Sequence, residues 1–306
     1  MAREPVVRAR RGSAHLEHAA RGCRAREDTT SLAPMPLTHF ATMMLERATL
    51  GVVVAGAIAF VAHRARALSR SGALAATAVG GAAVAASWHW GALLVAYFVV
   101  STLLSHFGRN RKEQLTSGVL AKDGERDATQ VIANGGIYAM SILLSALTTD
   151  KVAVTLSLAA LGALAAAAAD TWATEIGTLY GGTPRSLLTL RPVPPGSSGG
   201  VSVAGSLAMI AGAAFVAGVA LALDLTDDVA LVIVAGAAGA IADSLLGATL
   251  QERRWCAPCD RGSEQRVHNC GSSTRLVGGH EWMDNDVVNL IATFVGAAVA
   301  VLLAYV

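Results

Sequence analysis

Two long apolar runs in this chain end in an acidic residue, where a charged side chain is costly. The run Val152–Ala169 has no charged residue and leads directly into Asp170, and Val229–Ala242 leads in the same way into Asp243. An ionisable group at the end of a membrane span needs a partner, water or a metal ion. A single acid of this kind is explained equally well by a functional site and by a helix that ends at the water surface with a solvated carboxylate. Two acids in similar contexts predict a functional site.

Cationic side chains gather just before another apolar run, Ala128–Leu147. Lys and Arg are the usual protein donors to phosphate groups, although the flank of any membrane span can have this composition. An acid directly before the run is placed to cap the helix, and an amide two turns later shares its face. The phosphate-binding and catalytic candidates in this segment are Lys112, Lys122, Arg126, Asp127 and Asn134.

A second acid and a Gly/Ser-rich run follow Asp170. Glu175 is five positions further on, or about 140° around a helix. An unbroken helix would therefore give the two acids different partners, and a break would let them share one. The run Gly196–Ser202 opens the next apolar stretch, and backbone N–H groups at a helix N-terminus suit phosphate. Such turns are common in loops, but this one adds the candidates Gly199, Gly200 and Ser202.

Amides accompany Asp243 as well. Asn285 and Asn289 are four positions apart and share one face of a helix. Carboxylate and amide oxygens are the ligands that Mg²⁺ prefers, and Mg²⁺ completes its shell with water and substrate phosphates. We therefore predict a Mg²⁺ site formed by Asp127, Asp170 and Asp243, with Glu175 as a fourth candidate.

Cysteine and histidine cluster in the segment that follows. Cys256 and Cys259 form a Cys-x2-Cys pair, and His268 and Cys270 follow as His-x-Cys. This pattern predicts a structural Zn²⁺ that holds a loop too short to fold alone. The second pair is closer than in common zinc fingers, and such loops also occur without metal.

The composition indicates a membrane protein. Hydrophobic residues make up 53% of the chain and charged residues only 15%, against about 25% charged residues in soluble domains. We predict an all-α, polytopic bundle of seven or eight transmembrane helices. Its predicted spans are Ala48–Ala62, Gly72–Ser87, Gly91–Phe107, Ala128–Leu147, Val152–Ala169, Val201–Leu223, Val229–Leu250 and Val287–Val306.

Basic residues set the predicted orientation. Every Lys or Arg after residue 47 except Lys151 lies in one of the four segments 63–71, 108–127, 170–200 and 251–286. By the positive-inside rule these loops face the cytoplasm. The protein is therefore expected in the cell (inner) membrane.

The Arg-rich segment 1–47 conflicts with this orientation, because it would resist translocation. It lacks the apolar core of a secretory signal. A transit peptide or a contact with anionic lipid would explain it, and an over-extended start, with Met35, Met43 or Met44 as initiator, explains it more simply. We expect a disordered tail or such a start in 1–47, and one transmembrane domain in 48–306, in which Zn²⁺ would pin the loop 251–286.

Five motifs in order resemble those of the family that contains transmembrane protein 19 and plant phytyl-phosphate kinase. The resemblance covers roughly residues 50–306, and its motifs are Gly124–Gly136, Ala169–Gly177, Pro194–Ser202, Asp243–Gln251 and Asp284–Asn289. The resemblance implies a polytopic membrane enzyme related to nucleotide-dependent lipid kinases and cytidylyltransferases. The Arg-rich tail departs from the family pattern.

Together, the motifs and the resemblance predict a membrane transferase of the prenyl-phosphate kinase type. It would move a phosphoryl group from a nucleoside triphosphate, with CTP one candidate, to a prenyl or phytyl monophosphate, using Mg²⁺. The expected partners are this lipid phosphate, the nucleotide and the bilayer, with no nucleic acid, and a homo-oligomer is allowed. The alternatives are a membrane cytidylyltransferase that acts on a lipid phosphate and an ion-coupled transporter.

Overall fold

The computed structural model describes residues 37–116 and 124–305, with side chains from Thr42 onward. Contacts divide the chain into Met1–Ala41 and Thr42–Val306, and the description below concerns the second unit. Our predictions for Lys122 and for nearly all of the Arg-rich tail therefore lie outside the described residues.

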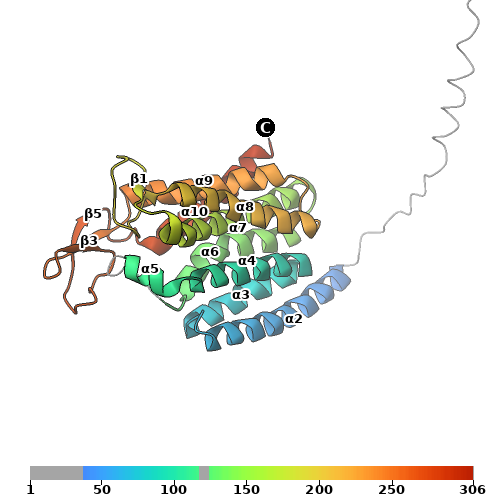
Figure 1. Cartoon of the computed structure of the whole chain (residues 1–306). Coiled ribbons are helices and arrows are strands. Elements are labelled where there is room, and N and C mark those ends of the chain that lie inside the picture. The colour runs from blue at the N-terminus through green and yellow to red at the C-terminus, as the bar shows by residue number, and fades with distance from the viewer. Residues whose placement is uncertain (1–36, 117–123, 306) are drawn as a thin grey trace, which may run out of the picture. The chain divides into compact units, whose positions relative to one another are not determined.

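The described part of the chain forms eight long helices and one short one (Figure 1). They are α2 (Leu37–Arg64), α3 (Arg70–Ala86), α4 (Trp88–His106), α5 (Arg109–Thr116), α6 (Ala128–Ala146), α7 (Asp150–Tyr180), α8 (Val203–Ala222), α9 (Val229–Thr249) and α10 (Asn285–Leu303). Each of the eight predicted spans corresponds to one long helix. The predicted all-α membrane bundle is confirmed.

The predicted count of seven or eight transmembrane helices is not confirmed. Among the described residues, six helices are long and apolar enough to cross a membrane: α2 from Thr42, α4, α7, α8, α9 and α10. The helix α3 has only 17 residues. The helix α6 has 19 residues but includes Asn134, Ser141, Ser145 and two glycines. Both helices lie within the bundle all the same.

Short strands form two small sheets at one end of the helices (Figure 1). The first pairs β1 (Arg185–Ser186) with β2 (Gly200–Val201), antiparallel. The second has the order β4-β3-β5, also antiparallel, and is made of β3 (Arg253–Cys256), β4 (Arg261–Ser263) and β5 (Arg275–Gly278). The first sheet lies in the loop that carries the Gly/Ser run, and the second lies in the loop that carries the Cys/His cluster.

The helix α7 forms the centre of the bundle and contacts α4, α6, α8, α9 and α10. Its residues 159–169 are all buried, and every one is Ala, Gly or Leu. A Cβ atom on Gly162 would lie 2.3 Å from the carbonyl oxygen of Gly296 in α10. Small side chains allow helices to approach this closely in lipid, where there is no hydrophobic drive between them.

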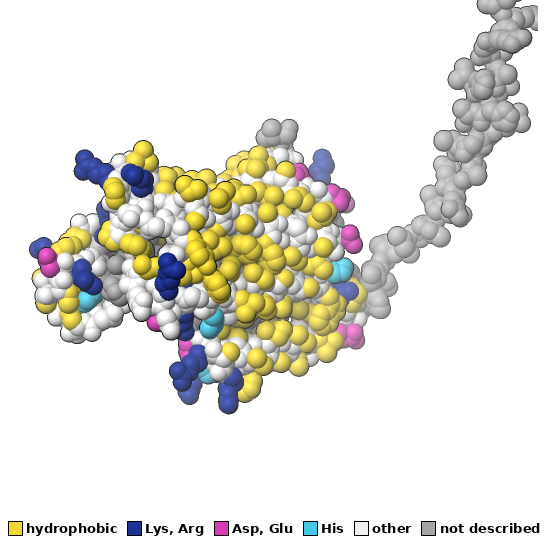
Figure 2. All heavy atoms as spheres, in the orientation of Figure 1, with side chains coloured by type: hydrophobic (Ala, Val, Ile, Leu, Met, Phe, Trp, Pro, Cys, Tyr) yellow, Lys and Arg dark blue, Asp and Glu magenta, His cyan; other side chains and the backbone are white. Residues whose placement is uncertain are grey.

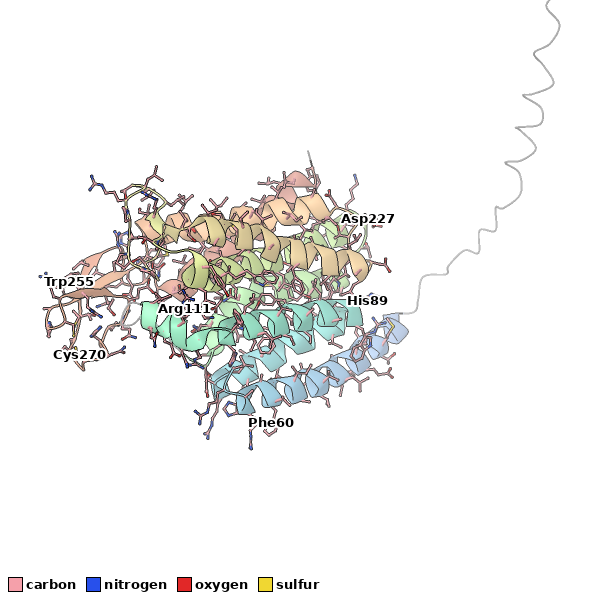
Figure 3. The ribbon with its side chains drawn as sticks, in the orientation of Figure 1. Phe60, His89, Arg111, Asp227, Trp255 and Cys270 are labelled. Carbon is pink, nitrogen blue, oxygen red and sulfur yellow. The ribbon has the colours of Figure 1, made fainter. Side chains whose placement is uncertain are left out.

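The four basic loops meet at one end of the bundle, as predicted from their charge. Arg66, Arg109, Arg126 and Arg266 come from three of these loops and line one cavity, together with residues of the fourth. Figure 2 shows most of the Lys and Arg side chains toward this end, and hydrophobic side chains over the helix flanks. In Figure 3 Asp227 lies at the opposite end.

The contact between α7 and α9 gives a first prediction. A Cβ atom on Gly239 would lie 2.4 Å from Ala166 Cβ and 2.7 Å from the Ala292 carbonyl oxygen. We expect Gly239→Val to separate these helices and to destabilise the protein by about 1–3 kcal/mol. Thermal unfolding in detergent measures this loss.

Gly218 in α8 provides the matched control, because nothing lies within 4 Å of a Cβ atom placed there. Gly218→Val should leave the melting temperature nearly unchanged. Equal melting temperatures for the two variants would contradict the tight α7–α9 contact.

Candidate active site

A cavity of about 880 Å³ lies at the end of the bundle where the loops meet. Its walls come from α5, from the loops after α2, α5, α7 and α9, from the C-terminal parts of α4, α7 and α9, and from the N-terminal parts of α6, α8 and α10. Several helices therefore begin or end at this cavity. The cavity collects polar groups from segments that are far apart in sequence.

Asp170 and Asp243 line the same cavity, as predicted. Their helices run in the same direction and touch at Ala166 and Gly239, and each acid lies one turn beyond its contact residue. The two carboxylates lie close enough to repel each other. The small-residue contact therefore brings together two acids that are separated by a long stretch of chain.

A third carboxylate on this wall was not predicted from the sequence. Glu264 accepts hydrogen bonds from the Ser198 hydroxyl and from Gln251 Nε2, the latter at 3.2 Å. It lines the cavity and repels Asp243 electrostatically. A single acid in a polar loop carries no sequence signal. Ser198 and Gln251 lie within motifs that we had singled out, but they were not chosen as site residues.

Glu175 is paired with a lysine of α5. The helix α7 continues unbroken through Asp170 and Glu175 to Tyr180, so the helix break that we considered does not occur. Glu175 Oε2 accepts from Lys112 Nζ at 2.5 Å, and Oε1 accepts from the Ser105 hydroxyl at 2.5 Å. Lys112 also donates to the carbonyl oxygens of Leu104 and Ser105. These contacts engage all three N–H groups of Lys112, and its binding of a phosphate stays a prediction.

Arg126 lies between the polar cavity and a smaller apolar pocket. Its guanidinium donates to the Ser105 hydroxyl at 3.1 Å, and its backbone N–H and C=O bond the Ala67 carbonyl and the Ser69 amide. Arg126 and Asn134 line both the polar cavity and a smaller apolar pocket of about 110 Å³. The apolar pocket lies between α2, α3, α4 and α6.

Asp127 caps α6 and is not among the residues that line the cavity. Its carboxylate accepts from the Gln130 amide at 3.0 Å and from the Thr129 hydroxyl at 2.7 Å. The Thr129 hydroxyl also lies 2.8 Å from Asp286 Oδ2. These contacts give Asp127 a structural role, and its binding of a metal stays a prediction.

The predicted Gly/Ser turn lies against the cavity and the end of α9. Gly199 has a φ of +71°, and a Cβ atom there would lie 2.6 Å from the Ala248 amide nitrogen. Only glycine fits both that backbone and that contact. Ser202 caps α8 by accepting from the Gly205 amide at 3.1 Å. Gly199, Gly200 and Ser202 all line the cavity, so the positive end of the α8 dipole points at it.

The predicted amides of α10 also reach the cavity. Asn285 and Asn289 both line it, and Asn289 is only 8% exposed. Asn289 Nδ2 donates to the Asn285 carbonyl at 3.0 Å. Because this bond uses the amide nitrogen, the side-chain oxygen remains the group suited to a cation or a donor.

Comparisons with known proteins agree with this architecture. The family model described as "Integral membrane protein DUF92" matches residues 53–297. The chain belongs to this family. It is 29% identical to Protein PGR of Arabidopsis thaliana over 80% of this chain and 92% of that protein. It is 31% identical to an uncharacterized membrane protein of Synechocystis over 71% of this chain and 74% of that protein.

A further relative of this DUF92 protein is Protein VTE6, chloroplastic, of Arabidopsis thaliana, at 28% identity over 77% of this chain and 65% of that protein. No solved structure matches the chain. The resemblance that we inferred from the five motifs is therefore confirmed at the level of the family.

The four predicted zinc ligands also come together. The ligand atoms of Cys256, Cys259, His268 and Cys270 all lie within 4.8 Å of one another. Hydrogen bonds from Ser272 and then His268 lower the pKa of the Cys270 thiol to about 5, so that it carries the charge of a thiolate, the form that binds metal. The hydrogen bond with Cys270 is the main cause that raises the pKa of Cys259, to about 11.

The Lys112–Glu175 pair gives the second prediction. The two side chains are only 10% and 20% exposed, so Lys112→Met leaves a largely buried carboxylate without its cation. We expect a loss of about 3 kcal/mol in the free energy of unfolding. The double variant Lys112→Met/Glu175→Met should be more stable than Lys112→Met alone, because no unpaired charge remains.

Arg109 and Glu113 offer a control on the same short helix. Their ion pair has side chains 43% and 42% exposed, and exposed pairs contribute less than about 1 kcal/mol. Thermal melting of Arg109→Met should therefore differ little from that of the parent protein. An unchanged melting temperature for Lys112→Met would mean that the pair does not hold α5 to α7.

Proposed function

We propose that this DUF92 protein transfers a phosphoryl group from a nucleoside triphosphate to the monophosphate of a prenyl lipid. One observation carries the proposal: Arg126, Gln130, Asn134 and Thr171 line both the polar cavity and the apolar pocket. A molecule with a phosphate at one end and a hydrocarbon chain at the other would fit this junction. The motif resemblance to plant phytyl-phosphate kinase points to the same substrate class.

The apolar pocket suits the first part of a lipid chain. Its walls include Ala55, Ala59, Ala76 and Leu94, and its polar lining residues are Tyr97 and the four that it shares with the cavity. The pocket is smaller than a whole prenyl chain, so the rest of the chain would extend toward the bilayer. Val95, which lines the pocket, is 36% exposed on the outer surface of α4 and marks this route.

The opposite wall of the cavity suits the triphosphate and Mg²⁺. Asp170, Asp243 and Glu264 bring three carboxylates to one wall, and carboxylate oxygens are the donors that Mg²⁺ prefers. When bound, Mg²⁺ would neutralise charge on the transferred phosphoryl group. The first turn of α8, next to Gly199 and Ser202, would offer backbone N–H groups to a phosphate.

The proposed reaction depends more on the positioning of the two substrates than on proton transfer. An oxygen of the lipid phosphate would form a new bond to the γ-phosphorus while the bond to the β-phosphate oxygen breaks, and the nucleoside diphosphate would leave. The attacking phosphate is already ionised, so no general base is required. Arg126 would hold that phosphate, and Lys112 would keep Glu175 in place beside it.

The two alternatives differ from this proposal in observable ways. A cytidylyltransferase would attack the α-phosphorus of CTP and release pyrophosphate. A transporter should hold its acids near the middle of broken helices. Here α7 and α9 continue unbroken past Asp170 and Asp243, and both acids lie next to cationic loops. This arrangement favours an enzyme over a transporter.

The decisive experiment is an assay of the purified protein with Mg²⁺, prenyl monophosphates of several chain lengths and each nucleoside triphosphate. We expect a prenyl diphosphate and a nucleoside diphosphate as products. Pyrophosphate release would instead identify a cytidylyltransferase. In membrane vesicles, the nucleotide should act only from the side that was cytoplasmic, where the positive-inside rule places the cavity. No turnover with any pair, together with ion uptake into liposomes, would favour the transporter.

The third prediction concerns the two aspartates. Asp170→Asn keeps the shape of the side chain but removes its charge, and the same holds for Asp243→Asn. Each change should lower kcat at least about 10³-fold, and the double variant should lose little more, because groups that act as a unit are not additive. Asp227→Asn, at the opposite end of the bundle (Figure 3), is the matched control and should keep full activity.

Near-normal turnover by both single variants in folded protein would place the metal site elsewhere. Loss of activity in only one of them would pair that residue with another acid, and Glu264 would be the first to test.

The fourth prediction concerns the apolar pocket. Ala76 lines it, whereas Ala78 is exposed on the same helix, α3, and does not line it. Ala76→Phe should lower kcat/KM for a long-chain prenyl phosphate about tenfold, since the ring would fill the pocket. A five-carbon prenyl phosphate should be affected less. Ala78→Phe should behave like the parent protein, and equal chain-length profiles for the two variants would contradict the assigned pocket.

A further inference from the structure

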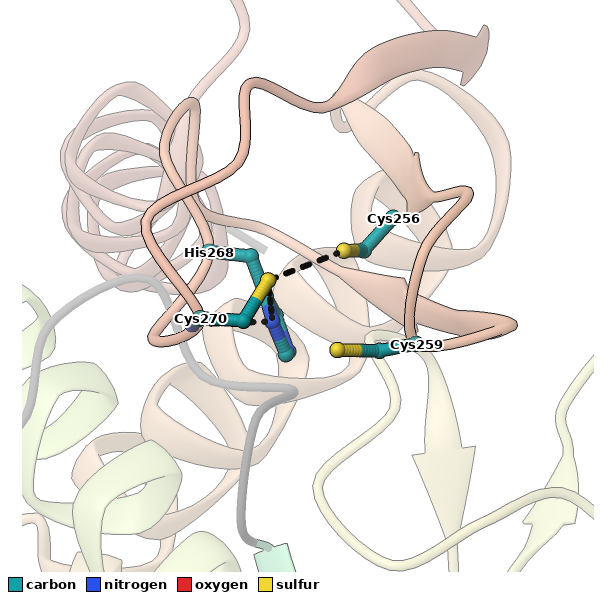
Figure 4. A group of neighbouring side chains, drawn as sticks. All are labelled: Cys256, Cys259, His268 and Cys270. Atoms are coloured by element: carbon teal, nitrogen blue, oxygen red, sulfur yellow. Dashed lines mark hydrogen bonds between the residues drawn. The ribbon is translucent and has the colours of Figure 1, made fainter.

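Four sulfur- or nitrogen-bearing side chains converge outside the cavity, in the loop between α9 and α10. Figure 4 shows that Cys256, Cys259, His268 and Cys270 point toward one another. Cys256 Sγ lies 3.6 Å from Cys270 Sγ, and His268 Nδ1 lies 3.3 Å from the same sulfur. Cys256 is fully buried and His268 is 7% exposed. The cluster is therefore formed and partly shielded from water.

The sulfur–sulfur distance matches the edge of a metal tetrahedron rather than a disulfide, and the nitrogen–sulfur distance is slightly shorter than such an edge. A disulfide needs a sulfur–sulfur distance of about 2.05 Å. A tetrahedral Zn²⁺ with Zn–S bonds of about 2.3 Å and Zn–N bonds of about 2.0–2.1 Å sets its ligand atoms roughly 3.5–3.8 Å apart. Three thiolates and one imidazole form a common structural zinc set, and four protein ligands leave no open position for catalysis.

The backbone around the ligands forms two turns that face each other. Cys256 ends β3, and Cys259 lies in the turn that leads to β4. On the other side, the His268 carbonyl accepts from the Gly271 amide at 2.8 Å, and the His268 amide donates to the Ser272 carbonyl at 2.9 Å. Each turn thus supplies two ligands, and a metal ion between them would tie the two ends of the loop together.

Apart from such a metal ion, the three-stranded sheet β4-β3-β5 has little to stabilise it. Its three strands have four, three and four residues. Val267, Leu276 and Val277 are exposed, so this segment has almost no apolar core of its own. Segments of this size fold when a metal supplies the missing free energy.

The same loop forms part of the cavity wall. Glu264 follows the last residue of β4 and lies between the two pairs of ligands in sequence. Its carboxylate accepts from Ser198, in the Gly/Ser turn, and from Gln251, just beyond α9. Any ordering of the loop is therefore transmitted to the turn that carries Gly199 and Ser202.

We propose that Cys256, Cys259, His268 and Cys270 bind one structural Zn²⁺, and that this ion fixes Glu264 as part of the cavity wall. The proposal concerns the folding of the loop and does not depend on which reaction the cavity catalyses. Its test therefore needs no substrate.

Metal analysis of the purified full chain is the first measurement. We expect close to one zinc per chain, with near-complete loss in Cys259→Ser. Cys259→His should retain zinc, because imidazole replaces one zinc ligand with another. Cys23→Ser is the matched control, since Cys23 is the one cysteine outside the cluster, and it should retain zinc. Wild-type protein without stoichiometric zinc, or with iron in its place, would overturn the assignment.

Proteolysis and hydrogen exchange test the effect on the loop. Arg261, Arg266 and Arg275 are exposed trypsin sites within it. Loss of zinc, in Cys259→Ser or after chelation, should raise cleavage there at least about tenfold, because cleavage follows the population of the open form. Amide exchange should rise both in residues 253–278 and in residues 196–202.

Glu264→Ala separates the two halves of the proposal. It should keep its zinc and its slow exchange in residues 253–278, while exchange in residues 196–202 rises. If loss of zinc leaves residues 196–202 unchanged, Glu264 does not couple the loop to the cavity, and that half of the proposal fails.

Discussion

The close approach of α7 to α9 and α10 is the contact on which the rest of this structure depends. Gly162 meets Gly296 backbone to backbone, and Gly239 touches both Ala166 and Ala292. Apolar side chains gain nothing by leaving lipid for one another, so helices in a bilayer associate through close packing and internal hydrogen bonds. Because the small residues fix the register of the three helices, the polar groups one turn further along meet at one level.

This register sets the positions of the polar groups that line the cavity, at one end of the bundle. In the core of the bundle, polar side chains link neighbouring helices: the Tyr138 hydroxyl donates to the Trp90 carbonyl at 2.6 Å, and the Thr293 hydroxyl donates to the Ala133 carbonyl at 3.0 Å. The carboxylates of the cavity lie where α7 and α9 approach the loops. Charged groups are costly within lipid, so a site that needs several of them is best placed where helix ends and loops bring water and cations.

The sequence was sufficient to predict the helices, because the length and apolarity of each run set their positions independently of one another. It also brought Asp170 and Asp243 to one site. It could not assign partners: no neighbour in the chain indicates that Lys112 contacts Glu175 and two carbonyl groups. Glu264 was missed for the same reason, since its role comes from where the loop folds back and not from its neighbours in the chain.

The bundle also divides the proposed work between two groups of helices. The helices α2, α3, α4 and α6 enclose the apolar pocket, while α7, α9 and the loop that follows α9 supply the carboxylates. Arg126 lies where the two groups meet and is held there through its own backbone by Ala67 and Ser69. A lipid phosphate would then approach from the bilayer and a nucleotide from the water, each along the side that suits its chemistry. The reacting groups would meet at a level where hydrocarbon, cation and carboxylate adjoin.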